Sequence, residues 1–318
     1  MTEATAVRET HLPGLELVAR GKVRDVYAVP PGGAAGPRLL LVATDRISAF
    51  DVVLPTAVPR KGVFLNQLSA FWFEKLQAVA DNHLVTVRPA EMPSKVKDLA
   101  RGLGGRAALV ERAQVVPVEC VVRGYLASSV EKAYRATGEI QGVKLPKGIP
   151  LGGKLPEPIF TPTTKEKSGH DVPLTYAELE AKVGKPLAAE LKATSLAVFR
   201  AASAHCESVG VLLADTKLEL GHVATGELAI VDELLTPDSS RFFKAKEHEP
   251  GKPPVAWDKQ LVRDYLLSLP DWNKQPPGPP LPDEIVVETA RRYREVLEIL
   301  AGRSLDEILR EQREARRP

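Results

Sequence analysis

The stretch LADTKLELG, residues 213–221, reads as a β-strand in which charged and uncharged side chains alternate. Asp215, Lys217 and Glu219 stand at every second position, and no charge lies between them. Successive side chains of a strand point to opposite faces, so these three share one face at spacings of about 7 Å. The pattern predicts a strand that is anchored to the core by its apolar face and presents acid, base and acid on the other.

The next segments extend this strand into a hairpin and add a fourth charge. GHVATGE, residues 221–227, is typical of a turn, and LAIVDELL, residues 228–235, is typical of a returning strand that carries Asp232. One interpretation is a ladder of salt bridges that faces water. The other is a site for polyphosphate and a hard cation, because Mg²⁺ takes one or two carboxylates and fills its other positions with phosphate oxygens and water.

The segment TPDSSRFF, residues 236–243, favours the second interpretation. It predicts a turn just beyond Asp232 that contains Asp238, Ser239, Ser240 and Arg241. Hydroxyl groups beside an arginine suit a phosphate monoester, because the guanidinium fork can bind phosphate through two parallel hydrogen bonds.

Four further segments combine glycine, hydroxyl or charged side chains with a predicted strand end, helix start or loop. Glycine lets backbone N–H groups approach phosphate oxygens, and a helix N-terminus with hydroxyls suits an anion. Charged turns, helix caps and solvated loops remain ordinary alternatives for them. The segments are RGKVRDVY (20–27), TDRISAFD (44–51), ECVVRGYLASS (119–129) and TPTTKEKSGHD (161–171). Their candidate residues are Gly21, Lys22, Arg24, Asp45, Arg46, Ser48, Asp51, Arg123, Ser128, Ser129, Lys165, Lys167, His170 and Asp171.

The remaining patterns predict a β-rich start followed by alternating helices and strands. Residues 145–173 are rich in Pro, Gly and Lys and predict a long segment without regular structure. Thr175 and Glu178 predict a capping box. Helices are expected at residues 66–79, 128–138, 187–210, 258–269 and 284–302, with a Pro-rich linker at 269–283 and a last helix capped by Ser304 and Glu307.

Composition excludes several classes of protein. The 318 residues are 44% apolar and 26% charged, and 43 basic residues nearly balance 41 acidic ones, which argues against a dedicated nucleic-acid binder or a polybasic membrane anchor. Cys120 and Cys206 form no CxxC pair and are expected to be buried, reduced thiols. The N-terminus lacks an apolar signal region, and no run approaches 18 apolar residues, so we expect a soluble, cytoplasmic protein.

Six stretches, taken in order, resemble the SAICAR synthetase (phosphoribosylaminoimidazole-succinocarboxamide synthase) family between about residues 17 and 267. They are GKVRDVY, DRISAFD, VPVECVVRGYLASS, IFTPTTK, ADTKLELG and VDELLTPDSSRFF. The resemblance implies an α+β, two-lobed, ATP-grasp-like fold, with C-terminal helices as in the longer family members. It implies a β-rich lobe with a phosphate loop over residues 1–112, an ATP- and substrate-binding α/β lobe over 113–269, and a linker with terminal helices over 270–318.

The activity implied by the resemblance is ATP-dependent ligation in de novo purine (IMP) biosynthesis. L-aspartate is joined to the carboxylate of carboxyaminoimidazole ribotide (CAIR) to give SAICAR, ADP and phosphate. The expected intermediate is an acyl phosphate, formed when this carboxylate accepts phosphate from ATP. ATP is then the co-substrate, Mg²⁺ the metal, and CAIR and aspartate the partners, with neither nucleic acid nor membrane involved. The sequence does not decide the oligomeric state, although a monomer is favoured.

The resemblance also implies roles for the candidate residues. The nucleotide is assigned to Gly21, Lys22, Arg24, Lys217, Glu219 and Asp232, of which Glu219 and Asp232 hold magnesium. CAIR and aspartate are assigned to Arg123, Ser129, Asp215, Ser240, Arg241 and Arg263. The reacting groups are expected to meet at Asp51, Lys165, Asp171, Asp215 and Lys217. Arg24 stands where many members have lysine, and the spacing around Lys167 and His170 differs from that of the short forms.

Two other functions are compatible with some of these features. A small-molecule kinase would also pair a glycine-bearing loop with carboxylates and Mg²⁺, although nothing resembles the HRD or DFG motifs of protein kinases. A regulatory nucleotide-binding module would need few groups for a second ligand, whereas Arg123, Arg241 and Arg263 indicate one.

Overall fold

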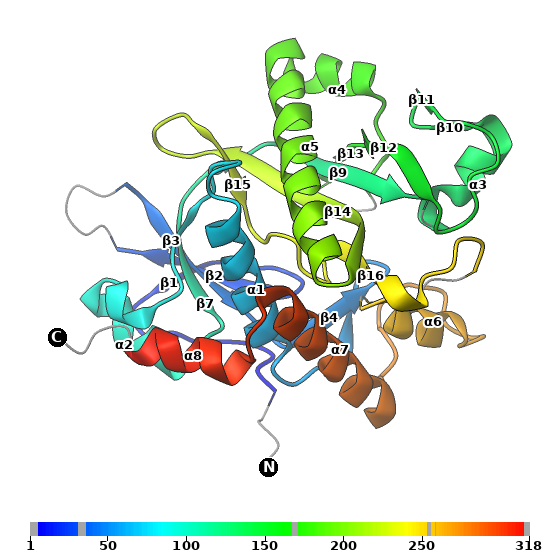
Figure 1. The fold of residues 1–318 in the computed structure, drawn as a ribbon. Coiled ribbons are helices and arrows are strands. Elements are labelled where there is room, and N and C mark those ends of the chain that lie inside the picture. The colour runs from blue at the N-terminus through cyan, green and yellow to red at the C-terminus, as the bar shows by residue number, and fades with distance from the viewer. Residues whose placement is uncertain are drawn as a thin grey trace.

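The computed structural model describes residues 6–30, 36–126, 128–166, 171–252, 256–257 and 259–314, and only the backbone of residues 128, 129 and 314. The fold is mixed α/β, with two principal antiparallel sheets and helices packed around them (Figure 1). Two short 3₁₀ helices, η1 (Pro89–Glu91) and η2 (Ala245–Glu247), lie in the connections.

The first sheet contains five antiparallel strands from the N-terminal third of the chain. Tyr27, Leu40 and Leu109 are buried on one of its faces together with residues of helix α2 (Ser94–Gly102). A separate hairpin, β4 (Arg46–Ala49) with β5 (Val52–Ala57), follows the third strand. The strand order of the sheet is β1 (Glu16–Arg20), β2 (Arg24–Val29), β3 (Arg38–Ala43), β7 (Ala107–Glu111) and β6 (Leu84–Thr86).

The second sheet has seven strands arranged around β14 (Val211–His222), the longest strand described. Helix α5 (Lys185–Ser208) runs across this sheet (Figure 1). The other strands are β8 (Gln114–Val115), β9 (Val118–Tyr125), β12 (Lys154–Phe160), β13 (Thr163–Thr164), β15 (Leu228–Val231) and β16 (Ser240–Lys244). Around it lie α3 (Ser128–Thr137), the small hairpin β10 (Glu139–Ile140) with β11 (Val143–Lys144), and α4 (Tyr176–Val183).

One edge of β14 changes its partner halfway along the strand. Asp215 pairs with Arg123 of β9 and also with Arg241 of β16, so β9 and β16 lie on opposite edges. Beyond Thr216 the β16 pairing ends, and β15 takes over that edge at Glu219. The chain between β15 and β16 leaves the sheet at this gap, and the N–H of Lys217 donates to the Ser239 carbonyl there, 2.9 Å away.

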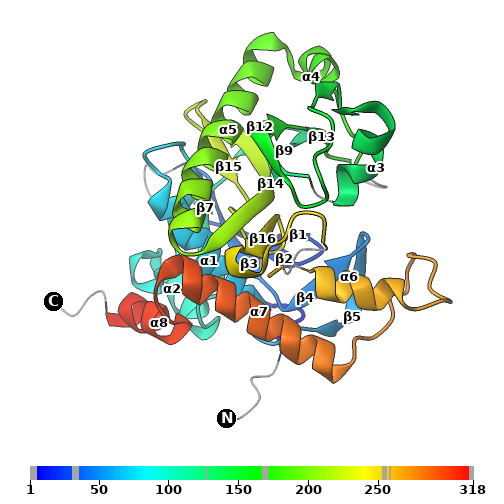
Figure 2. The same cartoon turned by 45° about the vertical axis from the view of Figure 1, so that its right-hand side comes forward.

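The C-terminal helices belong to the main core of the molecule. Helix α1 (Lys61–Lys75) packs beside α7 (Asp283–Ala301) and α8 (Leu305–Glu314), while α6 (Gln260–Leu267) lies at the other end of α7 (Figure 2). One buried cluster contains Trp72 of α1, Phe199 of α5, Leu218 of β14 and Val296 of α7. Residues from both ends of the chain therefore stabilise the strand that carries the alternating charges.

Several local predictions are confirmed. Thr175 and Glu178 form a capping box at α4, and Ser304 and Glu307 exchange the corresponding hydrogen bonds before α8. Helices α3, α5, α6 and α7 begin and end within two residues of their expected bounds. The hairpin of β14 and β15 also forms as expected, because the turn residues separate two runs whose alternation matches a strand.

Three local predictions are wrong. The helix expected at 66–79 is α1, at Lys61–Lys75, so it begins and ends earlier than expected. Hydrophobic periodicity does not reveal this start, because the first residue, Lys61, is a charged side chain that is buried in an ion pair with Asp238. Residues 145–173 are not without regular structure, since they contain β12 and β13. Pro156 and Pro158 are tolerated in β12 because it is an edge strand whose register shifts between Lys154 and Ile159. Ser240 and Arg241 lie in strand β16 and not in the preceding turn.

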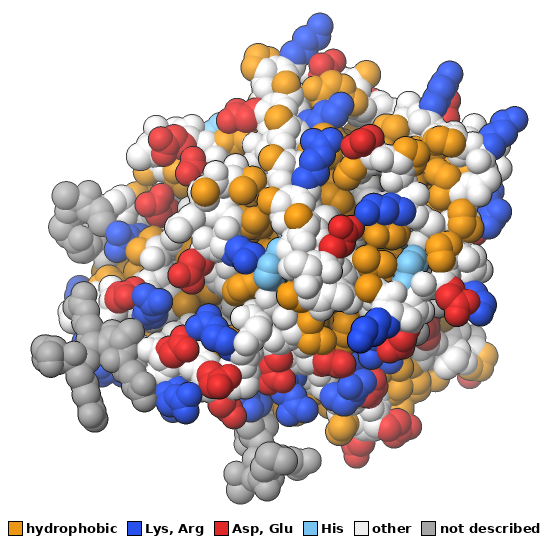
Figure 3. All heavy atoms as spheres, in the orientation of Figure 1, with side chains coloured by type: hydrophobic (Ala, Val, Ile, Leu, Met, Phe, Trp, Pro, Cys, Tyr) orange, Lys and Arg blue, Asp and Glu red, His pale blue; other side chains and the backbone are white. Residues whose placement is uncertain are grey.

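On one face of the molecule, the described surface shows no large patch of a single charge sign. Figure 3 shows basic and acidic side chains interspersed over that face. Among the helices of the described residues, none is long and apolar enough to cross a lipid bilayer.

Candidate functional site

The charged face of β14 lines two adjoining cavities. Leu218 and Leu220 on the opposite face are fully buried, so the alternation predicted from the sequence is confirmed. The larger cavity, a cleft of about 890 Å³, contains Lys217 and Glu219 in its wall. The smaller cavity, of about 460 Å³, contains Asp215 and again Lys217. Both are lined by Phe50, Lys217, Asp238 and Arg263, so the two cavities meet at these residues.

The smaller cavity is built around one carboxylate held between two arginines. Asp215 Oδ2 lies 3.2 Å from Arg123 Nη1 and 2.6 Å from Arg241 Nη2, and Arg241 Nε donates to Asp215 Oδ1 at 2.9 Å. Burial acts to raise the pKa of Asp215, but the charges of Arg241 and Arg123 outweigh it and hold that pKa below its ordinary value. Two guanidinium groups fixed around one carboxylate can present further N–H donors to a phosphate.

Two other groups complete this cavity. Ser240 also lines it, but its hydroxyl is buried and lies 2.8 Å from Thr216 Oγ1. Arg263, from α6, belongs to the lining of both cavities. A phosphate here would therefore be surrounded by side chains from β9, β16 and α6.

A second group of charges surrounds Lys217 in the larger cleft. Its ammonium pairs with Glu119 of β9 and lies 3.8 Å from Glu219, while Lys165 pairs with Glu219 from the opposite side. Burial acts to lower the pKa of Lys217, but Glu119 and Glu219 outweigh it and raise that pKa above its ordinary value. Lys217 is therefore a permanent cation at the point where the two cavities meet.

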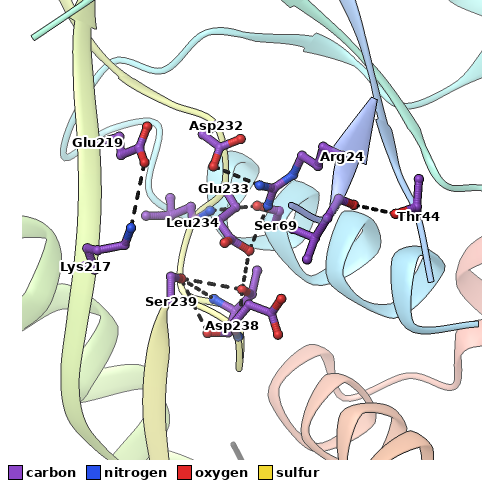
Figure 4. A network of polar contacts seen from close by, with 12 residues as sticks. Arg24, Thr44, Ser69, Lys217, Glu219, Asp232, Glu233, Leu234, Asp238 and Ser239 are labelled. Carbon is purple, nitrogen blue, oxygen red and sulfur yellow. Dashed lines mark hydrogen bonds and ion pairs between the residues drawn. The ribbon is translucent and has the colours of Figure 1, made fainter. Parts of the chain in front are cut away.

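Arg24 connects the first sheet to the far wall of the cleft. Its guanidinium lies 2.8 Å from Asp232 and 2.8 Å from Glu233, which directly follow β15 (Figure 4). The backbone of Asp232 has φ 65°, a left-handed conformation that is costly for a residue with a side chain and typical of functional sites. The ion pairs bridge the cleft between residues far apart in the sequence.

Glu219 and Asp232 fit a Mg²⁺ ion whose other ligands come from phosphate and water. The pKa of Asp232 is raised by burial, and the charge of Glu219 raises it further, so the two carboxylates repel each other and a divalent cation would relieve that repulsion. Among the described residues, no group of three His, Cys, Asp or Glu side chains forms a metal cage. Two carboxylates suffice for Mg²⁺ when phosphate oxygens supply the remaining ligands.

The loop around Gly21 and the hairpin β4–β5 form the rim of the cleft. Lys22 pairs with Asp51, and Phe50 and Asp51 have φ of 51° and 62°, another strained segment beside the cavity. The Gly21 N–H donates to the Arg24 carbonyl at 2.8 Å, so this amide closes the turn instead of pointing at a ligand. Lys22 and Asp51, paired with each other, both line the cleft at this rim.

The remaining predicted residues have different outcomes. Lys165 and Asp171 both line the cleft, although Asp171 is exposed and its carboxylate accepts the Glu166 N–H at 2.8 Å. Ser129 belongs to α3 by its backbone, and its side chain lies outside the described part of the structure. Lys167 and His170 also lie outside the described residues.

Sequence reasoning missed four charged residues of the site. Glu119 lies four positions before Arg123 on the same face of one strand, so the period of two could have revealed it. Glu233 binds Arg24, and Lys61 and Lys259 bind Asp238 at 2.7 and 3.4 Å. These three contacts join distant segments, so no local pattern indicates them.

Comparisons with known proteins show which family and which solved structures this chain is similar to. The family model described as SAICAR synthetase matches residues 17–279. A phosphoribosylaminoimidazole-succinocarboxamide synthase of Thermodesulfovibrio yellowstonii is 48% identical over 296 residues, covering 93% of this chain and 99% of the relative. The solved SAICAR-synthase of Saccharomyces cerevisiae complexed with SAICAR is 37% identical, with TM-score 0.81 and coverage of 94% and 99%. A SAICAR synthetase (type 2) in complex with ADP shares the fold at 23% identity, with TM-score 0.66 and coverage of 91% and 99%.

Changing either proposed metal ligand to its amide tests the carboxylate pair. Glu219→Gln and Asp232→Asn remove a charge with little change in volume, so each should weaken magnesium-dependent ADP binding about ten-fold or more while leaving the melting temperature within a few degrees. Calorimetric titration of ADP with and without Mg²⁺ measures the effect. Glu227→Gln, on the exposed turn of the same hairpin, is the matched control. Unchanged magnesium dependence in both variants would contradict the assignment.

Proposed function

The chain belongs to the SAICAR synthetase family, and on that premise we propose that it joins L-aspartate to the carboxylate of CAIR at the expense of ATP. The products are SAICAR, ADP and phosphate, in de novo purine biosynthesis. The observation that carries the proposal is the pair of adjoining cavities on one strand. Arg123 and Arg241 surround Asp215 in one cavity, acids and cations suited to a magnesium nucleotide line the other, and Lys217 lies between them.

The two ends of this groove suit different ligands. The yeast relative is complexed with SAICAR, and the more distant relative is in complex with ADP. We place the ribotide phosphate at Arg123 and Arg241, with Ser240, Ser129 and Arg263 around it. We place the nucleotide in the larger cleft, where Lys22 and Arg24 approach from the first sheet. The reacting carboxylate then lies near Lys217, which both cavities share.

The proposed reaction has two steps, because a carboxylate is a poor electrophile. A carboxylate oxygen of CAIR attacks the γ-phosphorus of ATP, which breaks the bond to ADP and forms an acyl phosphate. The aspartate amine then attacks the acyl carbon, the C–O bond to phosphate breaks, and the amine loses a proton as the amide forms. Each step gathers several anions, so fixed cations are needed to hold them in reacting geometry.

The residues of the cleft supply this stabilisation. Lys217 is a cation held by Glu119, and Lys165 is held by Glu219 until Mg²⁺ takes that carboxylate. Both lysines line the cleft in which the anions are proposed to bind. Mg²⁺, held by Glu219 and Asp232, would neutralise the polyphosphate. Asp51 and Asp171 line the same cleft, and we propose that they lie near the aspartate amine, where a carboxylate can receive its proton.

The broader organisation is also part of the proposal. We infer an ATP-grasp-like arrangement in which residues 1–112 form a lobe over the substrate-binding lobe, 113–269, followed by the C-terminal segment, 270–318. The five-stranded sheet is built from residues 16–111 and the seven-stranded sheet from residues 114–244, which supports the first boundary. A cytoplasmic location and a monomeric state remain predictions.

Release of ADP by the purified protein tests the proposed reaction. With Mg-ATP present and CAIR or aspartate omitted in turn, ADP should be released at the full rate only when both are present, and SAICAR should appear in equal amount. Coupled ADP detection and chromatography measure the two products. Stable transfer of phosphate to a hydroxyl compound would instead indicate a kinase, and ATP binding without turnover would indicate a regulatory module.

Truncation of Arg241 tests the placement of the ribotide phosphate. Arg241→Ala removes a charge-assisted contact, so the KM for CAIR should rise about 10- to 100-fold while the KM for ATP changes less than about three-fold. Steady-state kinetics with each substrate varied separately measure the split. Arg200→Ala, which removes an exposed guanidinium elsewhere on the molecule, serves as the control. Equal increases in both KM values would contradict the placement.

A further inference from the structure

Asp238 is a buried carboxylate in the part of the lining that both cavities share. Its side chain is 3% exposed and receives three donors from three different parts of the chain. Lys61 Nζ lies 2.7 Å and Lys259 Nζ 3.4 Å from Oδ2, while the Tyr293 hydroxyl donates to Oδ1 at 2.8 Å. The carboxylate therefore connects the start of α1, the residue before α6 and the middle of α7.

The three donors do not hold the carboxylate in the same way. Lys61 is completely buried, and its ammonium also lies 5.8 Å from the centroid of the Tyr293 ring. Both lysines contact the same oxygen, Oδ2. Tyr293, 1% exposed, contacts the other oxygen and adds a further restraint on rotation about the Cβ–Cγ bond. A hydroxyl of a C-terminal helix thus helps to set the orientation of a carboxylate in the site.

Lys259 is the group whose position depends on this orientation. Its ammonium has the longer contact with Asp238, and it lines the larger cleft beside Asp51 and Arg263. Burial lowers the pKa of Lys259 below its ordinary value, and the charge of Asp238 acts against that shift. If the carboxylate turns, the ammonium moves relative to the cleft.

We propose that Tyr293 is a positioning residue for the ligation reaction, acting through Asp238 to place the Lys259 ammonium in the cleft. The inference rests on the proposed function for the reaction, but the contacts that carry it do not depend on which substrates bind. It also gives the C-terminal segment a role in the site. Helix α7 packs against α1, which brings Tyr293 from the end of the chain to a loop between β15 and β16.

Removal of the hydroxyl alone tests this role in the full-length protein. Tyr293→Phe should lower kcat about ten-fold while the KM for ATP changes less than about two-fold, because a displaced ammonium affects reacting geometry more than nucleotide binding. Thr289→Ala removes another buried hydroxyl from the same helix, one that donates to the Ile285 carbonyl of α7 at 2.6 Å. This control should lose stability without losing kcat. Equal loss of kcat in both variants, or wild-type kcat in Tyr293→Phe, would overturn the proposal.

A second readout is independent of the ligation reaction. Labelling with an amine-selective reagent, mapped by peptide mass spectrometry, should show Lys259 reacting at least about three-fold faster in Tyr293→Phe than in wild type, and at the wild-type rate in Thr289→Ala. If wild-type protein makes no SAICAR, the proposed function fails while this labelling result still decides the positioning role. Should Tyr293→Phe not fold, Asp238→Asn must give the same faster labelling. An unchanged rate at Lys259 would overturn the inference.

Discussion

The strand β14 carries alternating charges on the face that lines the two cavities, and the structure depends on how those partly buried charges are neutralised. An isolated buried charge is costly, so each one needs a counter-charge in fixed geometry. Asp215 forms ion pairs with Arg123 and Arg241 of the two neighbouring strands, and Lys217 forms an ion pair with Glu119. The opposite, apolar face packs into the core shared by α1, α5 and α7. The same strand thereby stabilises the core and organises the site.

The ion pairs of the cleft also explain how substrates of high charge can bind. Arg24 with Asp232, and Lys165 with Glu219, bridge segments that lie far apart in the sequence. A magnesium nucleotide offers the same groups new partners: phosphates for the cations, and the metal for the acids. Binding then exchanges one set of ion pairs for another, and the site is already ordered before the substrates arrive. The strained backbone at Phe50, Asp51 and Asp232 lies along the same cleft.

The sequence alone predicted those features that depend on the spacing of residues close together in the chain. The alternation at Asp215, Lys217 and Glu219 predicted the charged face, and the Thr175 and Ser304 caps predicted helix starts, because each depends on neighbouring residues alone. The roles of the candidate residues came from the family resemblance.

Contacts between residues far apart in the chain could not be predicted from local sequence patterns. Helix α1 begins at Lys61, whose ammonium binds Asp238, and Lys259 of the cleft contacts the same carboxylate. Neither contact has a local signature in the sequence. The Gly21 turn closes on itself through its own N–H, which a glycine in a sequence cannot reveal.

A crystal structure of the protein with ADP, Mn²⁺ and SAICAR would test the central claim, that one strand holds the metal nucleotide at one end and the ribotide phosphate at the other. Anomalous scattering locates Mn²⁺ independently of the protein model. We predict the ion between Glu219 and Asp232, and the phosphate of SAICAR against Arg123 and Arg241. The opposite arrangement, with the metal away from both carboxylates or the ribotide phosphate in the larger cleft, would contradict the claim.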